Sequence, residues 1–174
     1  MSTLEQLLDR EAIRDCLYHY CRGIDLLDEE ALRSAYWDDA SDCHGPYKGS
    51  ANGFIEWALK TLQSMDRSVH QITNVLIELR GESAVVESKF SAFQRGPNQN
   101  GVLEQTVILG RYADLFEKRA GKWKIARRTV IYDWVAPHPT SSANDAQRFG
   151  QRQPVGSRWP DDEIYNVLNS KHVE

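Results

Sequence analysis

The sequence has 174 residues, enough for one domain of ordinary size, and 41% of them are hydrophobic and 26% charged. This composition is typical of a globular protein and excludes the collagen-like and intrinsically disordered classes. The 21 basic and 25 acidic residues give a formal net charge of −4. That charge is too small and of the wrong sign for a protein built to bind nucleic-acid phosphates, so we expect no nucleic-acid partner.

The first predicted helix begins with a capping-box pattern, in which Thr3 is followed three positions later by Gln6. Apolar residues then follow at helical spacing as far as Ile24. Gly23 is a typical C-terminal breaker, so we expect the helix to end near it. Asp25 follows directly, flanked by apolar residues. It is expected either to turn inward or to cap the next helix.

Two more helices are expected in the first third of the chain. Asp28 is well placed to cap a second helix, which should stop around Asp38. A short strand pair, broken by a Gly-Pro turn, is expected over residues 40–48. Ser50 then begins a third helix with an apolar face. The first third of the chain is therefore predicted to be mainly helical.

From residue 69 the pattern changes to period two, which predicts strands. The runs cover residues 69–79, 84–94, 102–119 and 123–135. The intervening turns are short enough for antiparallel hairpins, so a meander is the simplest topology. Helices placed before such a sheet predict an α+β fold, a cone-shaped barrel of strongly twisted antiparallel sheet covered by three N-terminal helices. Such a cone would enclose a pocket.

Alternation along the strands predicts which side chains face that pocket. In the second run the inward face is expected to carry Ala84, Val86, Phe90 and Ala92. In the first run His70 shares a face with Ile72, Asn74 and Leu76. An inward histidine needs a hydrogen-bond partner, and Asp25 is a candidate.

The last strand carries two adjacent arginines, Arg127 and Arg128, and large apolar residues occur at both parities. The alternation therefore leaves open which arginine points inward. Tyr20, on the apolar stripe of the first helix, is by default a core residue whose hydroxyl needs a partner. Taken one at a time, these polar residues favour a structural role over a catalytic one.

The remainder of the chain, residues 137–174, is rich in proline, serine and glycine and has no periodicity. We expect two parts: a domain over residues 1–136 and an extended C-terminal tail over 137–174. Trp159 and Tyr165, the latter in a possible short helix, indicate that the tail packs on the pocket mouth or on a neighbouring subunit.

Several common site types are missing from the sequence. It contains no Walker, GxGxxG, GxSxG or HExxH motif, so we expect no cofactor and no metal. Cys16, Cys21 and Cys43 fit no metal-ligand or CxxC spacing and favour a reducing, cytoplasmic location. No stretch has the length of a membrane-spanning helix, and no signal-peptide pattern is present, so no membrane partner is expected.

Three segments together resemble the SnoaL-like branch of the nuclear-transport-factor-2-like superfamily. They are the helix 11–25 that ends in aspartate, the strand His70-Gln-Ile-Thr-Asn74, and the hairpin 112–128 with its Gly-Lys-Trp-Lys-Ile turn. The resemblance covers about residues 5 to 136 and implies the cone fold. Within the branch the pattern is most similar to scytalone dehydratase, bile-acid 7-alpha-dehydratase and hexachlorocyclohexane dehydrochlorinase.

This resemblance also implies site residues and roles. It maps an Asp–His dyad onto Asp25 and His70 and a last-strand arginine onto Arg128. His70 would be the general base, oriented by Asp25, while Arg128 would stabilise negative charge or bridge to Asp25. Tyr20 would donate to the enolate oxygen or the departing hydroxyl. The dehydrochlorinase has a lysine at that position, so Tyr20 argues for elimination of water rather than halide.

The implied activity is that of a cofactor-independent lyase, most simply a dehydratase, acting on a hydrophobic cyclic or aromatic hydroxy compound (a steroid, a polyketide or a lignin-derived aromatic). Formaldehyde elimination or isomerisation would use the same base. A non-catalytic small subunit of an aromatic-ring dioxygenase is the alternative outside enzymes. The expected pocket lining is Phe54, Trp57, Met65, Phe90 and Tyr132.

A homotrimer is the expected assembly. The similar catalytic members of the family are trimers, and one face of the sheet carries Val107, Leu109 and Leu115 at one parity. Apolar residues on the outer side of a sheet are typical of an interface.

Overall fold

The computed structural model describes residues 3–98, 100–138 and 144–170. Within these ranges a helical first third precedes long strands, as the sequence predicts. The helices are α1 (Leu4–Leu26), α2 (Glu29–Ser34), α3 (Ala51–Gln63), α4 (Asp145–Phe149) and α5 (Glu163–Asn169). The strands are β1 (Tyr36–His44), β2 (Tyr47–Ser50), β3 (Arg67–Arg80), β4 (Ser83–Pro97), β5 (Leu103–Arg119) and β6 (Lys122–His138).

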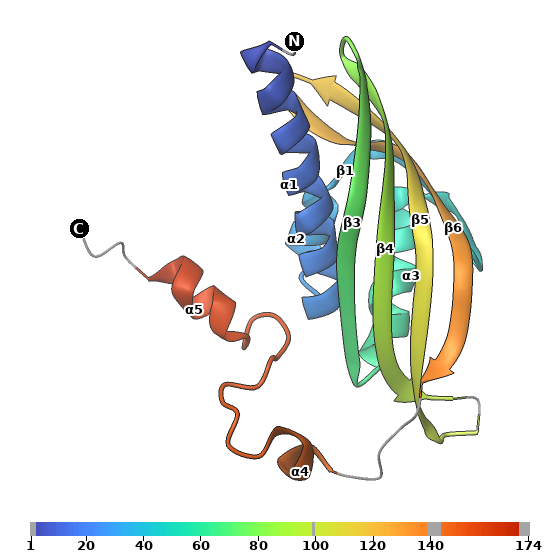
Figure 1. The fold of residues 1–174 in the computed structure, drawn as a ribbon, viewed down its shortest axis with the longest axis vertical. Helices are drawn as coiled ribbons and strands as arrows, with labels where there is room; N and C mark the ends of the chain where they lie inside the picture. Colours follow the sequence, from blue (N-terminus) through green and yellow to red (C-terminus); the bar gives the residue numbers. More distant parts are fainter. Residues whose placement is uncertain (1–2, 99, 139–143, 171–174) are drawn as a thin grey trace.

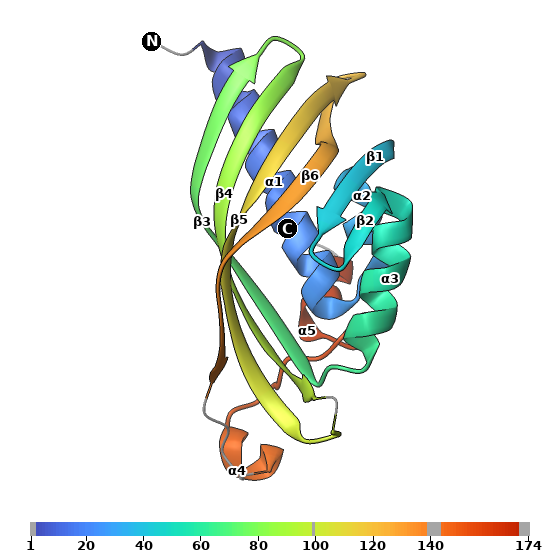
Figure 2. The ribbon, with the colours of Figure 1, turned by 90° about the vertical axis from the view of Figure 1, so that its right-hand side faces the viewer.

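The strands form one six-stranded twisted sheet in the order β2-β1-β6-β5-β4-β3. Strands β3 to β6 are the predicted antiparallel meander, whereas β1 pairs with β6 in parallel. Helices α1 and α3 lie on the same side of the curved sheet, with α3 beside β1 and β2 (Figure 1, Figure 2). The α+β prediction is confirmed, but the sheet is open rather than closed into a barrel.

The core lies between these helices and the inner face of the sheet. On β4 the four residues predicted to face inward, Ala84, Val86, Phe90 and Ala92, are all buried. Phe93, at the opposite parity, is 44% exposed. The alternation arises because successive side chains of a strand point to opposite faces, so one face of β4 packs against the core.

Helix α1 is longer than predicted. It begins at the Thr3 capping box but continues past Gly23 to Leu26, and Leu27 ends it in the left-handed region with φ 53°. A Cβ atom on Gly23 would lie 2.6 Å from the backbone nitrogen of Leu32 in α2. Gly23 therefore allows α1 and α2 to approach closely rather than ending α1. As a result, Asp25 lies in the last turn of α1.

Helix α2 is shorter than predicted. Asp28 caps it as expected, accepting from the Ala31 N–H at 2.9 Å, but it ends at Ser34 instead of near Asp38. Tyr36 already belongs to β1, which hydrogen-bonds to β6. This pairing joins residues about 90 positions apart, and it outweighs the helical spacing that the sequence shows locally.

Irregularities in the long strands change which side chains face inward. The β3–β4 register shifts between Thr73 and Leu76, where Asn74 has φ 48°. Beyond this bulge Ile77 is buried and Leu76 is 65% exposed. The expectation that Leu76 shares the face of His70 is therefore wrong, because one extra residue in a bulge inverts the alternation after it.

The C-terminal tail packs against its own chain at the end of α1. The Trp159 N–H donates to the Leu26 carbonyl at 2.8 Å, and the Tyr165 hydroxyl donates to Asp28 at 2.8 Å. Arg158 donates to the carbonyl of Leu62 at 3.0 Å.

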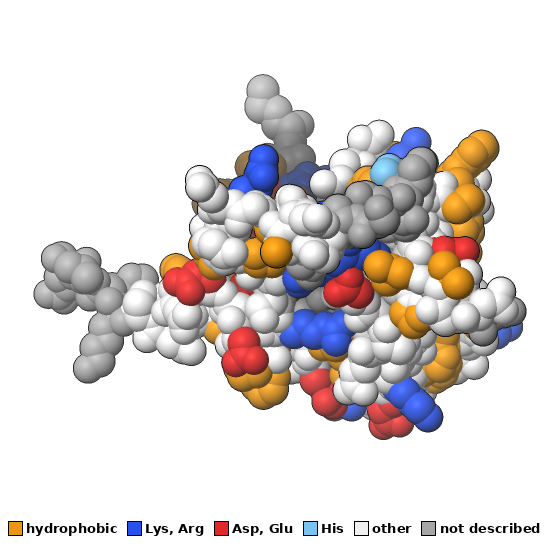
Figure 3. Space-filling view, turned by 90° about the horizontal axis from the view of Figure 1, so that it is seen from below, with side chains coloured by type: hydrophobic (Ala, Val, Ile, Leu, Met, Phe, Trp, Pro, Cys, Tyr) orange, Lys and Arg blue, Asp and Glu red, His pale blue; other side chains and the backbone are white. Residues whose placement is uncertain are grey.

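Viewed from below, hydrophobic side chains gather on the side of the molecule opposite α5 (Figure 3). Among the helices of the described ranges, none is long and apolar enough to cross a membrane.

Candidate active site

A cavity of about 280 Å³ lies between α1, α3 and the inner face of the sheet. All five residues expected to line a pocket line this one: Phe54, Trp57, Met65, Phe90 and Tyr132. Its polar lining includes Tyr20, His44, His70 and Tyr112. The cavity is therefore mainly aromatic and aliphatic, with a few convergent polar groups, as small-molecule sites usually are.

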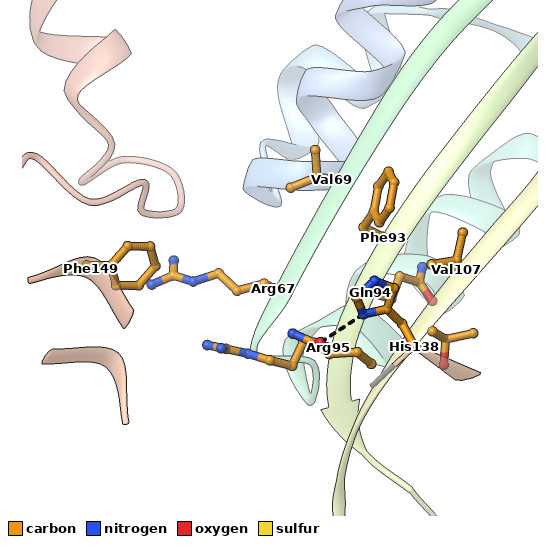
Figure 4. Close-up of a pocket in the computed structure, with 10 residues that line it drawn as sticks. Arg67, Val69, Phe93, Gln94, Arg95, Val107, His138 and Phe149 are labelled. Atoms are coloured by element: carbon orange, nitrogen blue, oxygen red, sulfur yellow. Dashed lines mark hydrogen bonds between the residues drawn. The ribbon is translucent and has the colours of Figure 1, made fainter. Parts of the chain in front are cut away.

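The outer face of the sheet carries a separate hollow of about 200 Å³ (Figure 4). Val69, Phe93 and Val107 line it from β3, β4 and β5, and the Arg67 guanidinium lies 5.7 Å from the ring centre of Phe149 in α4. Neither Asp25 nor His70 lines this hollow. His70 lines the inner cavity instead.

Asp25 and His70 form a hydrogen-bonded dyad at the inner cavity. The Nδ1 atom of His70 lies 2.6 Å from one oxygen of Asp25, and the backbone N–H of His70 donates to the other oxygen at 2.7 Å. The Ser68 hydroxyl adds a third donor at 3.3 Å. A carboxylate surrounded by donors accepts the Nδ1 proton, which leaves the Nε2 lone pair of a neutral His70 free for a substrate.

Asp25 is not the cap of α2, because Asp28 occupies that position. The placement of the dyad follows from the length of α1. Its last turn lies beside the start of β3, so a carboxylate on that turn reaches both the backbone and the ring of His70. The two residues are 45 positions apart in the sequence.

The Tyr20 hydroxyl is buried at the cavity and has no hydrogen-bond partner among the described residues. The Tyr112 hydroxyl is also buried at the cavity without a partner among these residues. Burial raises the pKa of each phenol well above its usual value, so both keep their protons at neutral pH. An unsatisfied buried donor is costly, and a ligand oxygen in the cavity would satisfy it.

Arg128 is the inward arginine, and Arg127 is exposed. A register shift explains this, since Leu115 pairs with Arg127 but Phe116 pairs with Ile125, which leaves Ala126 in a bulge. Large apolar residues therefore occur at both parities of β6 because the strand changes face at that bulge.

Arg128 does not line the cavity and pairs with Asp114 rather than with Asp25. Its two hydrogen bonds to Asp114 measure 2.9 and 2.7 Å, and both side chains are fully buried. The guanidinium lies 4.1 Å from the ring centre of Tyr20 and 4.0 Å from that of Tyr112. It therefore packs behind the two phenols and holds their rings in place.

The sequence analysis missed a second histidine–carboxylate pair. His44 lines the cavity, and its Nδ1 atom lies 3.2 Å from the buried Asp42. Its ring stacks on Phe54 with 4.5 Å between centroids. A signal was available, because Asp42 and His44 stand two positions apart in a predicted strand and so share a face.

Comparisons with known proteins agree with this fold. The SnoaL-like domain family matches residues 5–129. Hexachlorocyclohexane dehydrochlorinase 1 of Sphingobium indicum is 28% identical over 144 residues, which cover 79% of this chain and 90% of that protein.

Solved structures that share the fold include two that are related to elimination enzymes by name. One is a type 2 hexachlorocyclohexane dehydrochlorinase (LinA), with a TM-score of 0.73 and 22% identity over 82% of this chain and 97% of that one. The other is a “Putative Scytalone Dehydratase” from Novosphingobium aromaticivorans, with a TM-score of 0.67 and 20% identity over 79% of this chain and 93% of that one. Because the family match spans well over half of the sequence, the chain belongs to the SnoaL-like domain family.

Proposed function

We propose that the protein is a cofactor-independent lyase that eliminates water from a hydrophobic cyclic or aromatic hydroxy compound. The observation that carries this proposal is the Asp25–His70 hydrogen bond of 2.6 Å at the wall of an apolar cavity. A hydrogen-bonded, largely enclosed carboxylate behind an imidazole is the arrangement that makes histidine an effective base near neutral pH. The names of the dehydrochlorinase and dehydratase relatives agree with elimination chemistry.

In the proposed reaction, His70 removes a proton from a carbon next to a carbonyl or conjugated with one. The C–H electrons form the new double bond as the C–O bond breaks, and the hydroxyl takes the proton from the His70 imidazolium and leaves as water, which returns His70 to its neutral form. Asp25 holds the imidazole in the correct tautomer and stabilises the imidazolium without taking its proton. General base catalysis of this kind contributes about 10²–10⁴-fold to the rate.

Tyr20 is the proposed electrophilic partner of the base. Its hydroxyl is protonated, buried and unpaired within the described structure, so it can donate to the enolate oxygen or to the departing hydroxyl. Arg128 acts through Tyr20, since it contacts the ring and not the cavity. We therefore assign Arg128 a positioning role.

We also propose that the protein assembles as a homotrimer through the outer face of the sheet. Val69, Phe93 and Leu109 are 48%, 44% and 39% exposed on that face, and Figure 4 shows Val69 and Phe93 beside its hollow. Exposed apolar side chains grouped in this way are typical of an interface. Phe93→Asp should convert the trimer to a monomer in sedimentation velocity, whereas Tyr18→Asp, on exposed α1 surface, should not.

The function is tested by screening hydroxy-steroids, aryl diols and hydroxylated polyketides for new absorbance from a conjugated alkene. A substrate should be turned over by the wild-type protein and not by His70→Ala. Release of formaldehyde in place of water would show that the eliminated group differs. Full activity of His70→Ala on a confirmed substrate, or co-purification with an iron–sulfur partner and no turnover, would overturn the proposal.

A further inference from the structure

The mechanism above leaves one acid–base pair of the cavity unused, the pair formed by Asp42 and His44. It comes from β1, while the dyad comes from α1 and β3. Both histidines nevertheless line the same cavity. Asp42 satisfies only the Nδ1 edge of the His44 imidazole, so the other ring nitrogen keeps a hydrogen-bonding capacity that a ligand in the cavity can use.

Hydrogen bonds orient the His44 ring. Asp42 is buried and accepts the Tyr36 hydroxyl at 2.7 Å through one oxygen, while its other oxygen faces His44 Nδ1 at 3.2 Å. The carboxylate accepts on both sides, so Nδ1 carries the proton. Stacking on Phe54 fixes the ring plane. The Nε2 atom, on the opposite edge of the ring, is left for the cavity.

The environment of His44 favours its neutral form, mainly because the ring is buried. Burial lowers its pKa, and the charges of Arg128 and His70 lower it further. Asp42 acts in the opposite direction, but burial is the larger effect, so the pKa lies below the usual value of 6.5. Tyr112, whose ring centre is 6.4 Å away, keeps its proton. At neutral pH, Nε2 of His44 is therefore a lone-pair acceptor.

We infer that His44, held by Asp42, is a substrate-recognition residue that accepts a hydrogen bond from a second hydroxyl of the substrate, distinct from the hydroxyl that leaves. The inference rests on the proposed function for the identity of the cavity as the substrate site. A leaving hydroxyl needs a proton donor, which a neutral His44 cannot supply through Nε2. A retained hydroxyl, as in a phenol or a ring alcohol, needs the acceptor that His44 offers.

The buried phenols of Tyr20 and Tyr112 add hydrogen-bond donors to the same cavity. Tyr20 and Tyr112 offer donors to an acceptor oxygen, and His44 offers an acceptor to a hydroxyl. The cavity is thus complementary to a hydroxylated cyclic ketone or a phenolic compound with an acceptor oxygen. A halogenated hydrocarbon has no hydroxyl and would leave all these groups unpaired, which makes it a poor ligand.

The test measures binding, so it does not depend on turnover. Calorimetry with 2-naphthol and 2-fluoronaphthalene compares two probes of similar shape, of which only the first is a hydroxyl donor. We expect His44→Phe to weaken the binding of 2-naphthol, relative to the binding of 2-fluoronaphthalene, by about 3- to 10-fold. This is the effect of losing one neutral hydrogen bond. The matched variant His19→Phe, which removes an exposed imidazole on α1 outside the cavity, should keep the wild-type ratio of the two affinities.

A pH series on the His70→Phe variant provides a second readout that needs no change at His44. The preference for 2-naphthol should be present at pH 8 and weaken only once the pH falls through the lowered pKa of His44, because a protonated His44 cannot accept a hydrogen bond. An unchanged ratio in His44→Phe, or loss of the preference in His70→Phe, would overturn the inference. A His44-dependent preference without any elimination activity would instead refute only the proposed function.

Discussion

Replacing Arg128 with methionine tests whether this arginine is structural, because it removes a positive charge from a fully enclosed site. Arg128 and Asp114 have 0% side-chain exposure and share two hydrogen bonds. Without the arginine, Asp114 is a buried carboxylate that has lost its paired cation. Breaking a buried pair in this way destabilises a protein by about 3–5 kcal/mol. That is a large share of the roughly 5–15 kcal/mol that stabilises a typical domain.

The loss of stability in Arg128→Met should depend on pH. Burial raises the pKa of Asp114, and Arg128 opposes that rise, so Arg128→Met should raise the pKa further. A carboxyl whose folded-state pKa lies above its unfolded value is most favourable to folding when it is protonated. Its contribution therefore falls as the pH rises from the unfolded pKa, about 4, through the folded pKa. The stability deficit of Arg128→Met should accordingly be smaller at pH 5 than at pH 8.

Urea unfolding followed by tryptophan fluorescence, at one fixed protein concentration, measures these changes. Arg127→Met is the matched control, since Arg127 is exposed, and its effect should stay within about 0.5 kcal/mol. The double variant Arg128→Met/Asp114→Leu removes both charges and should be more stable than Arg128→Met alone. An Arg128→Met protein within about 1 kcal/mol of wild type at pH 8 would show that the buried pair does not stabilise the fold.

Three further predictions concern the dyad, the phenol and the contact between α1 and α2. Asp25→Asn and His70→Ala should each lower kcat by about 10²–10⁴-fold on a confirmed substrate, and the double variant should be little slower, because both residues form one base; additive losses in steady-state kinetics would contradict this. Tyr20→Phe should lower kcat by about 10²–10³-fold without loss of stability, since its hydroxyl has no partner within the described structure; unchanged kcat would exclude it as a donor. Gly23→Ala should destabilise the fold by about 1–3 kcal/mol in urea, because its Cβ would meet the Leu32 backbone at 2.6 Å; a more stable variant would show that α2 can shift.

Much of the architecture was predictable from local patterns. The helix caps Thr3, Asp28 and Ser50 act within a few residues of their own position, and all three occupy the predicted places. Alternation along β4 correctly identified its buried face, because side chains of an unbroken strand point alternately to two sides. Strand parity made Asp25 a candidate partner for His70, and resemblance to the family supplied the pairing, which joins residues 45 positions apart.

Only the tertiary structure decided which polar side chains meet. Bulges near Asn74 and Ala126 invert the alternation, so Leu76 faces outward and Arg128 faces inward, and neither bulge has a clear mark in the sequence. The parallel pairing of β1 with β6 ends α2 early and brings His44 to the cavity wall. These features depend on contacts between distant segments, and such contacts override local preference because they bury far more surface than a single turn can.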